Sequence, residues 1–478
     1  MYRYNVRRQT MNFQNIEFKR RFSTNFYKNK FIKLGEMSFD KDFVNDSRGD
    51  MYPIINKSAD CRERIEDGKY RVLCGSVTRF MCQFFPYATY SLNAEINHGE
   101  VGFLFRLPNA DALIAIANDS LTYTCGDTHI EMPIPTPFSL RVSCRPGKFD
   151  IFLDDGKCFT TISEPKFENS NSEEIFSNGF AALYASGDAL TNHVSAYIDS
   201  GISIADMRPI RCENGEIMQE NGRVYITASL RMEEGAIQGV LSWIPSTAEF
   251  ELCGALFYNS GDGKWCGDVA ASILFHRAEG RWYLWVCSFS HGHVLGHAEF
   301  DGDPRFGVNV IDIELMEKAD NGAVISEFAG FSGDEDPDFI YDSEKHRWLM
   351  AICRLDPVIH AYRYVFFESS SPFGGYHFIG KGLDGAETGG SFVRVDGELY
   401  FICGNSFDKT SDYRIYSKST VIEPKFDYPD GGFRGWGTVM PIKQGSRTRY
   451  FWLTFDRHNA SPYNWSYGNL YVFEAYTK

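Results

Sequence analysis

Short runs in which apolar and polar residues alternate fill most of this chain from about residue 85 onward. EVGFLFRL at 100–107 and FSLRVSC at 138–144 are examples, and turn signals such as DDG and RPG separate the runs. Alternation with a period of two is typical of strands that bury one face. No segment keeps apolar residues at helical spacing over several turns. The pattern therefore predicts an all-β fold.

The first half of the chain divides into two parts. Residues 1–37 are basic and indicate an N-terminal arm, whereas residues 38–199 hold closely spaced alternating runs that predict a β-sandwich domain. The segments 138–162 and 179–198 resemble concanavalin- and laminin-G-like jelly rolls, so the expected sandwich is jelly-roll-like. Such a domain either binds sugar or supports the next domain structurally, and the strand pattern leaves both roles open.

The second half of the chain repeats one unit five times. Each repeat has a strand, a turn with Gly or a charged pair, and an aromatic-rich strand, and the repeats begin near residues 216, 272, 338, 391 and 438. A small twisted sheet of this size cannot bury its faces alone, and a ring of such sheets can. Residues 200–478 are therefore predicted to form a five-bladed β-propeller. A second large sandwich would not explain why the second strand is so regularly aromatic.

Acidic residues stand just ahead of the first strand in three of these repeats. They are Asp268 in WCGDVAASILF, Asp334 and Asp336 in SGDEDPDFIY, and Glu387 in GAETGGSFV. The innermost strands of a propeller surround its channel, so their equivalent ends meet at one mouth. Carboxylates gathered there suit glycoside hydrolysis, because one protonates the leaving oxygen while another activates water or attacks the sugar. Asp334 and Asp338 are expected to be solvated or turn-forming neighbours.

These segments resemble five-bladed glycosidases of the arabinanase/β-xylosidase and invertase/fructanase families. The resemblance rests on WCGD at 265–268, on DP at 336–337 and on ETG at 387–389. It implies that Glu387 is the general acid and that Asp336 sets the pKa of this acid. The first repeat departs from those families, which keep an Asp there as base or nucleophile. Asp206 is our first candidate for that role and Glu213 the second.

The loops after the second strand of each repeat return to the same mouth, because hairpins reverse the chain. They are rich in polar side chains that suit sugar hydroxyls. Together with residues ahead of the first strands, the predicted substrate-binding set is Trp265, Asp268, His291, Arg354, Asn405, Trp436 and Arg457. His291, His293 and His297 lie close in sequence, but spacing reveals no partner carboxylate. No metal ion and no other cofactor is predicted.

Composition narrows the choice of partners. The formal net charge of −15 argues against nucleic acid, whose phosphates require clustered Lys and Arg. No apolar run is long enough for a membrane span, and the basic N-terminus lacks the apolar stretch of a secretory signal. The 12 cysteines stand singly, which fits reduced thiols. We therefore expect a cytoplasmic protein whose partner is an oligosaccharide, with self-association left open.

The sequence thus predicts an exo-acting glycoside hydrolase for short oligosaccharides, with arabinofuranosides or fructofuranosides favoured by the resemblance. A propeller that binds sugar without turnover is the second possibility, because the acid of the first repeat is ambiguous. A glycoside phosphorylase or transferase is the third. It would need a cationic pair near the mouth, such as Arg354 with Arg457, to hold phosphate.

Overall fold

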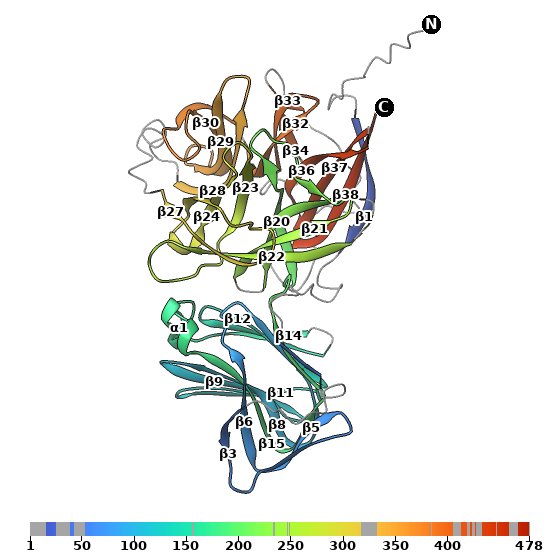
Figure 1. The fold of residues 1–478 in the computed structure, drawn as a ribbon, viewed down its shortest axis with the longest axis vertical. Helices are drawn as coiled ribbons and strands as arrows, with labels where there is room; N and C mark the ends of the chain where they lie inside the picture. Colours follow the sequence, from blue (N-terminus) through green and yellow to red (C-terminus); the bar gives the residue numbers. More distant parts are fainter. Residues whose placement is uncertain are drawn as a thin grey trace.

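The chain forms two bodies that lie one above the other along the long axis of the molecule (Figure 1). A computed structural model describes residues 16–24, 39–42, 53–154, 157–232, 235–245, 247, 249–316, 332–383, 385–404, 413–417, 421–422, 426, 433–445, 447–457 and 467–477. The described parts of both bodies consist mainly of strands, and a short α-helix, α1 (Glu173–Asn178), lies near their junction. Among the described residues, no helix is long and apolar enough to cross a membrane.

The lower body is a sandwich of two antiparallel sheets, as the alternating runs predict. The larger sheet has the order β11-β10-β9-β8-β15-β5-β4, and β6 pairs with β15 and β3. Its strands are β3 (Ile54–Lys57), β4 (Arg62–Glu66), β5 (Lys69–Cys74), β6 (Ser76–Gln83), β8 (Glu95–Leu107), β9 (Ala110–Ile116), β10 (Ser120–Cys125), β11 (Thr128–Pro133) and β15 (Phe180–Thr191).

The smaller sheet of the sandwich has the order β14-β13-β12-β7-β16-β2. Its strands are β2 (Phe39–Asp42), β7 (Thr89–Asn93), β12 (Ser139–Arg145), β13 (Lys148–Leu153), β14 (Lys157–Ser163) and β16 (His193–Tyr197). Aromatic side chains of the two sheets meet in the core, where the rings of Phe105 and Phe149 lie 5.6 Å apart. The apolar positions of the alternating runs therefore form the inward faces of both sheets.

The upper body is a five-bladed β-propeller, as the five repeats predict. Blade one holds β17 (Ser203–Pro209), β19 (Gln219–Glu220), β20 (Arg223–Arg231), β21 (Ala236–Trp243), β22 (Phe250–Asn259) and β26 (Gly307–Asp312). Blade two holds β18 (Arg211–Cys212), β23 (Val269–His276), β24 (Arg281–Ser288), β25 (Val294–Phe300) and β27 (Glu314–Leu315). The innermost strand of blade one is thus β17, which begins earlier than the repeat pattern indicates.

The remaining three blades complete the ring. Blade three holds β28 (Ser332–Asp342), β29 (Arg347–Asp356), β30 (Ala361–Ser369) and β31 (His377–Lys381). Blade four holds β32 (Thr388–Val395), β33 (Glu398–Gly404), β34 (Tyr413–Tyr416) and β35 (Val421–Ile422). Blade five holds β36 (Phe433–Gln444), β37 (Arg447–Arg457), β38 (Tyr467–Thr477) and β1 (Ile16–Thr24). Contacts run from β17 to β23, β28, β32 and β36 in turn and back to β17.

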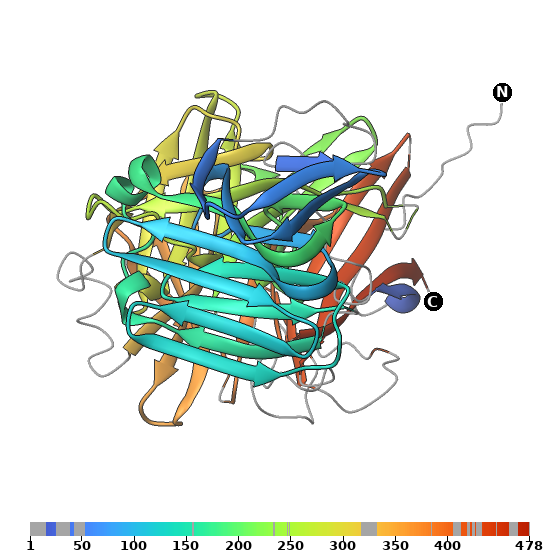
Figure 2. The ribbon, with the colours of Figure 1, turned by 90° about the horizontal axis from the view of Figure 1, so that it is seen from below.

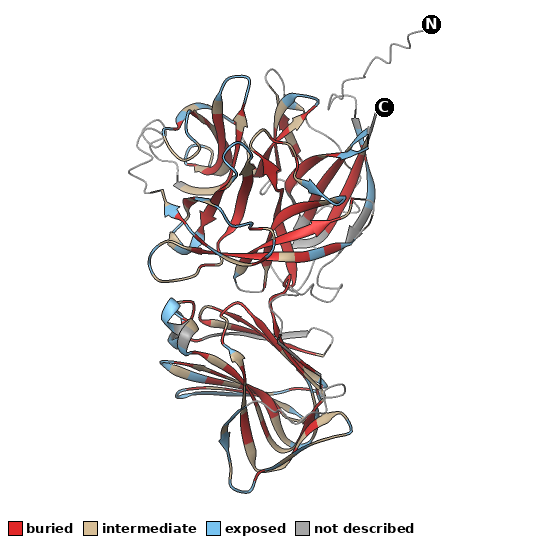
Figure 3. Cartoon of the chain, in the orientation of Figure 1, coloured by how far each residue is buried: buried red, intermediate tan, exposed pale blue. Residues whose placement is uncertain are grey.

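Strand β1 links the beginning of the chain to its end. It pairs antiparallel with β38 from Ile16 opposite Thr477 to Thr24 opposite Leu470. Part of the segment expected to be an arm is therefore the outermost strand of blade five, which the sequence pattern does not indicate. This pairing covers the edge of β38, and an uncovered edge strand tends to pair with other chains. Figure 3 shows that buried residues run along most strands of the ring, whereas exposed residues gather in the turns and at the outer strands.

Seen from below, the sandwich lies in front of the ring (Figure 2). It contacts the loop before β23, on the face at which the innermost strands begin. The carbonyl of Trp265 accepts hydrogen bonds from the Tyr87 hydroxyl at 2.7 Å and from the Asn171 amide at 2.8 Å. The indole of Trp265 stacks on Phe176 of α1, with ring centroids 3.9 Å apart. The sandwich therefore stands beside the expected mouth on the side of blades one and two.

Candidate functional site

The innermost strand of every blade carries a β-bulge at the same place. Two residues there oppose a single residue of the second strand, and the bulged pairs are 206–207, 270–271, 336–337, 389–390 and 436–437. The first residue of each pair has positive φ, and these residues are Asp206, Ala270, Asp336, Gly389 and Trp436. Four of the five are not glycine, although this conformation costs about 1–2 kcal/mol for other residues. The five positions are structurally equivalent and lie around the axis of the ring.

Two acids occupy this common register, one from blade one and one from blade three. Asp206 and Asp336 are both buried, with 7% and 6% of their surface exposed. The Asp206 carboxylate accepts a hydrogen bond from the Ser229 hydroxyl at 2.5 Å. The Asp336 carboxylate accepts hydrogen bonds from the Thr388 hydroxyl and the Gly389 amide, both at 3.1 Å. The structure therefore brings together the two acids that the sequence proposed for the first and third repeats.

The electrostatics of Asp336 reflect this proximity. The pKa of the Asp336 carboxyl is raised to about 7. Burial is the largest cause, and the negative charges of Asp206 and then Glu335 are the next. Two carboxyl groups that share a site cannot both ionise easily, so the pKa of one is pushed upward. Asp336 is thus a carboxyl that holds its proton near neutral pH beside a second acid.

Arg208 closes the axis directly behind this pair. Its guanidinium donates hydrogen bonds to the carbonyls of Ala270 at 3.1 Å, Asp336 at 3.0 Å and Gly390 at 2.8 Å. It also lies 4.4 Å from the centroid of the Trp436 ring. One side chain of blade one therefore contacts the other four blades. A buried guanidinium with several fixed acceptors satisfies its fork of donors and holds the inner strands in register.

A second charged pair lies one layer deeper. The Arg211 guanidinium and the Asp338 carboxylate form an ion pair at 2.5 Å, and the side chains are only 2% and 0% exposed. Asp338 also accepts the Phe392 amide at 2.6 Å. The expectation that Asp338 is a solvated neighbour is therefore wrong, because its charge is neutralised inside the ring.

Glu387, the general acid implied by the resemblance, lies in a different environment. Its side chain has no exposed surface. One carboxylate oxygen accepts the Arg414 guanidinium at 2.9 Å and the Tyr416 hydroxyl, and the other accepts the Tyr364 amide at 2.9 Å. The carboxylate therefore sits between blades three and four, bound to protein groups that neutralise it. This corrects the expectation that Glu387 meets Asp336 at a shared opening.

Asp268 of blade two and Asp334 of blade three occupy the same register as Glu387, and both are bonded to protein groups of their own blade. Asp268 accepts the Ser288 hydroxyl at 2.7 Å and the Ser290 amide at 3.0 Å, so its carboxylate lies within blade two. Asp334 pairs with both arms of the Arg354 guanidinium, at 2.5 and 2.9 Å. Asp268 and Arg354 are thus both buried and bonded to protein groups, and their substrate-binding roles stay predictions.

Three further predicted residues lie outside the mouth layer or have no free surface there. Glu213 pairs with Arg277 at 3.2 Å, just beyond the far end of β23, so it is not a substitute for Asp206. Trp265 stacks on the sandwich, as described above. Trp436 belongs to the mouth layer but is only 4% exposed, because it packs on Arg208 and fills the space beside Gly389. The Trp436 indole therefore offers little surface for a sugar ring, and the Trp265 indole is partly covered by the sandwich.

The remaining predicted residues are His291, Asn405 and Arg457. One ring nitrogen of His291 lies 2.8 Å from the Ser288 hydroxyl and the other 3.0 Å from the Ser260 hydroxyl. Cys266, Asp268 and His291 offer ligand atoms within 4.8 Å of one another, a carboxylate neighbour that sequence spacing did not reveal. Asn405 and the side chain of Arg457 lie outside the described residues.

One polar group beside the mouth was missed by the sequence analysis. Glu335 precedes Asp336, and its carboxylate is 20% exposed. It accepts the Tyr362 hydroxyl at 2.9 Å and lies 3.2 Å from the imidazole of His293, a half-exposed residue with positive φ. The acidic run GDEDPD held this signal, but the strand pattern gave no reason to separate Glu335 from its acidic neighbours.

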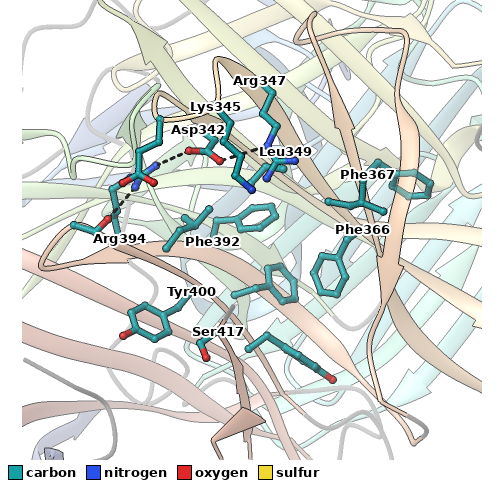
Figure 4. Close-up of a pocket in the computed structure, with 16 residues that line it drawn as sticks. Asp342, Lys345, Arg347, Leu349, Phe366, Phe367, Phe392, Arg394, Tyr400 and Ser417 are labelled. Atoms are coloured by element: carbon teal, nitrogen blue, oxygen red, sulfur yellow. Dashed lines mark hydrogen bonds and ion pairs between the residues drawn. The ribbon is translucent and has the colours of Figure 1, made fainter. Parts of the chain in front are cut away.

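A pocket of about 300 Å³ opens elsewhere, between blades three and four (Figure 4). Aromatic side chains line much of it, namely Phe366, Phe367, Phe392, Tyr400, Phe401 and Tyr416. Asp342 lies 3.4 Å from Arg347 and 3.8 Å from Arg394 at its edge. The pocket includes the turns at the far ends of β28 and β32, so it is separate from the mouth, and no predicted site residue lines it.

Comparison with known proteins finds likeness only at the level of solved structures. No family model matches the sequence, and no curated protein matches it. A GH43 β-1,3-galactosidase with galactodeoxynojirimycin is similar over 56% of this chain and 93% of its own, with 9% identity and a TM-score of 0.38. Bacillus subtilis levansucrase is similar over 58% and 86%, with 9% identity and a TM-score of 0.40. The Crh5 transglycosylase is similar over 38% and 89%, with 11% identity and a TM-score of 0.26.

Proposed function

We propose that this chain is a glycoside hydrolase whose catalytic groups are the Asp206 and Asp336 carboxyls. The observation that carries the proposal is the placement of these two acids at equivalent bulges of blades one and three. There they are close enough for the charge of Asp206 to raise the pKa of Asp336. Acid–base chemistry at a glycosidic bond requires a carboxyl that keeps its proton near neutral pH beside a second carboxyl.

The two carboxyls take different roles. Asp336, with a pKa of about 7, protonates the leaving oxygen, and its hydrogen bonds from Thr388 and Gly389 fix its orientation. Asp206, oriented by the Ser229 hydroxyl, acts as base or nucleophile. Glu335 adds a third negative charge that favours the protonated form of Asp336. Glu387 has no part in this scheme, because Arg414 neutralises it away from the pair.

The closed axis favours action on chain ends. The Arg208 guanidinium lies behind the pair and bonds to backbone carbonyls of blades two, three and four. A sugar chain therefore cannot thread through the ring past the carboxyls. This agrees with exo-action on short oligosaccharides, in which the chain end enters the mouth. Furanosides remain the proposed substrate class on the resemblance of the sequence motifs alone.

A sugar-binding propeller without turnover is the second candidate. Its support is the burial of Glu387, which removes the acid that the resemblance implies. A phosphorylase or transferase gains less support, because Asp334 already holds Arg354. The proposed location is the cytoplasm, and the free thiols of the described cysteines are compatible with it.

A screen of nitrophenyl glycosides and small oligosaccharides tests the proposal. The wild type is assayed beside Asp336→Asn, with Glu387→Gln as the matched control from blade four. We expect turnover of at least one furanoside by the wild type and the control, and none above background by Asp336→Asn. Equal turnover by all folded variants would remove Asp336 from the chemistry. Sugar binding without turnover by the wild type would favour the second candidate.

A further inference from the structure

Three side chains with metal-binding groups meet at the start of blade two. Cys266 and Asp268 come from the loop before β23, and His291 comes from the turn after β24. Their ligand atoms lie within 4.8 Å of one another. Cys266 and Asp268 are buried, and the His291 side chain keeps 21% of its surface exposed. Separate segments thus bring a thiol, a carboxylate and an imidazole to one point, with access from solvent.

Neighbouring groups already orient these three side chains. The Ser288 hydroxyl lies between Asp268 and His291, at 2.7 Å from the carboxylate and 2.8 Å from the imidazole. The Ser290 amide donates to Asp268 at 3.0 Å, and the Asn171 amide approaches the Cys266 sulfur at 4.0 Å. Hydrogen bonds of this kind fix the direction of metal ligands and are typical of the surroundings of protein metal sites.

The donor set selects the class of ion. A thiolate is a soft ligand that Mg²⁺ and Ca²⁺ avoid, because these ions prefer oxygen. Sulfur, imidazole nitrogen and carboxylate oxygen are the three ligand types that Zn²⁺ takes in proteins. Three protein ligands leave one position of a tetrahedral ion for water. We propose that Cys266, Asp268 and His291 form a zinc site.

The position of the Cys266, Asp268 and His291 cluster beside the sandwich indicates a structural role for the bound ion. Trp265, next to Cys266, packs on the sandwich, and the Asn171 amide reaches both the Trp265 carbonyl and the Cys266 sulfur. A bound ion would therefore connect the loop before β23, which contacts the sandwich, to the turn after β24. Zinc binding here stabilises the junction of the two domains beside the mouth, whether or not the mouth turns over sugar.

Metal analysis and cobalt substitution test the site. The full-length protein is stripped with a chelator and titrated with Zn²⁺ or Co²⁺, and bound metal is counted by mass spectrometry. We expect about one equivalent per chain, and a cobalt spectrum with a thiolate-to-metal charge-transfer band. Cys266→Ser should abolish that band, and His291→Asn should weaken metal binding by about 10-fold or more. Cys253→Ser and His377→Asn, which change residues outside the cluster, should bind metal as the wild type does.

Folding is monitored in parallel by circular dichroism and thermal unfolding. His291→Asn alters a partly exposed side chain, so it remains informative if Cys266→Ser does not fold. Zn²⁺ should raise the unfolding temperature of the wild type and leave that of His291→Asn unchanged. A wild-type protein that binds no metal, or a charge-transfer band that persists in Cys266→Ser, would overturn the proposal. These readouts require no sugar substrate.

Discussion

Two buried acidic groups near the start of the inner strands behave in opposite ways. Asp336 faces a second acid across the axis, and its pKa rises to about 7. Glu387, two residues ahead of the equivalent bulge in blade four, is held by Arg414, Tyr416 and a backbone amide. Burial alone therefore does not mark a functional carboxyl. The partner decides whether a buried acid keeps a proton for chemistry or serves as half of a structural ion pair.

The comparison first predicts a contrast in turnover between blade one and blade four. Asp206→Asn should lower kcat/KM by roughly 10⁴-fold, because it removes the base or nucleophile. Glu387→Gln should retain kcat/KM within a few-fold of the wild type wherever it is folded. Steady-state kinetics on the best substrate of the screen measures both. A loss of comparable size in folded Glu387→Gln would break the distinction between the two acids.

The second prediction concerns stability. Glu387→Gln should lower the free energy of unfolding by about 3 kcal/mol, because the fully buried carboxylate no longer pairs with the Arg414 guanidinium. Asp206→Asn should cost less, since the variant relieves repulsion with Asp336. Urea unfolding of both variants at one pH measures the difference. Adding Arg414→Met to Glu387→Gln should recover part of the loss, whereas an additive further loss would argue against a paired role.

The third prediction concerns the pH dependence of turnover. Asp336 must carry its proton to act as the acid, so kcat/KM should fall about tenfold per pH unit above about 7. Glu387→Gln should keep this limb at the same pH. A limb that moves with Glu387→Gln would assign the acid to blade four after all.

The fourth prediction concerns the pH dependence of stability. The pKa of Asp336 is raised in the folded state, so the folded protein binds the proton more tightly than the unfolded chain does between about pH 4 and pH 7. The contribution of Asp336 to stability is therefore greatest below this window and falls by up to about 1.4 kcal/mol per pH unit as pH rises through it. Asp336→Asn should lose this component. Unfolding free energies at pH 5 and pH 7 for both proteins measure it, and parallel changes would contradict it.

Sequence periodicity was enough to predict the β-sandwich and the propeller, because alternation and repetition follow directly from which residues are buried. It did not suffice for the site, because a bulge changes which residues share a register. Asp268, Asp334 and Glu387 precede their bulges by two residues, whereas Asp206 and Asp336 begin theirs. From the sequence pattern alone, Asp336 was placed at the same register as Asp268 and Glu387. Strand β1 was missed for another reason, since its partner β38 lies at the opposite end of the chain.

The most direct test of the account is the pKa of the Asp336 carboxyl itself. It can be followed by carbon NMR of protein labelled at aspartate carboxyls, with Asp336→Asn used to assign the resonance. We expect an apparent pKa near 7 in the wild type and a clearly lower one in Asp206→Asn, because the neighbouring charge is gone. An Asp336 carboxyl that titrates near its ordinary value of 3.8 in both proteins would contradict the claim that the two acids form one site.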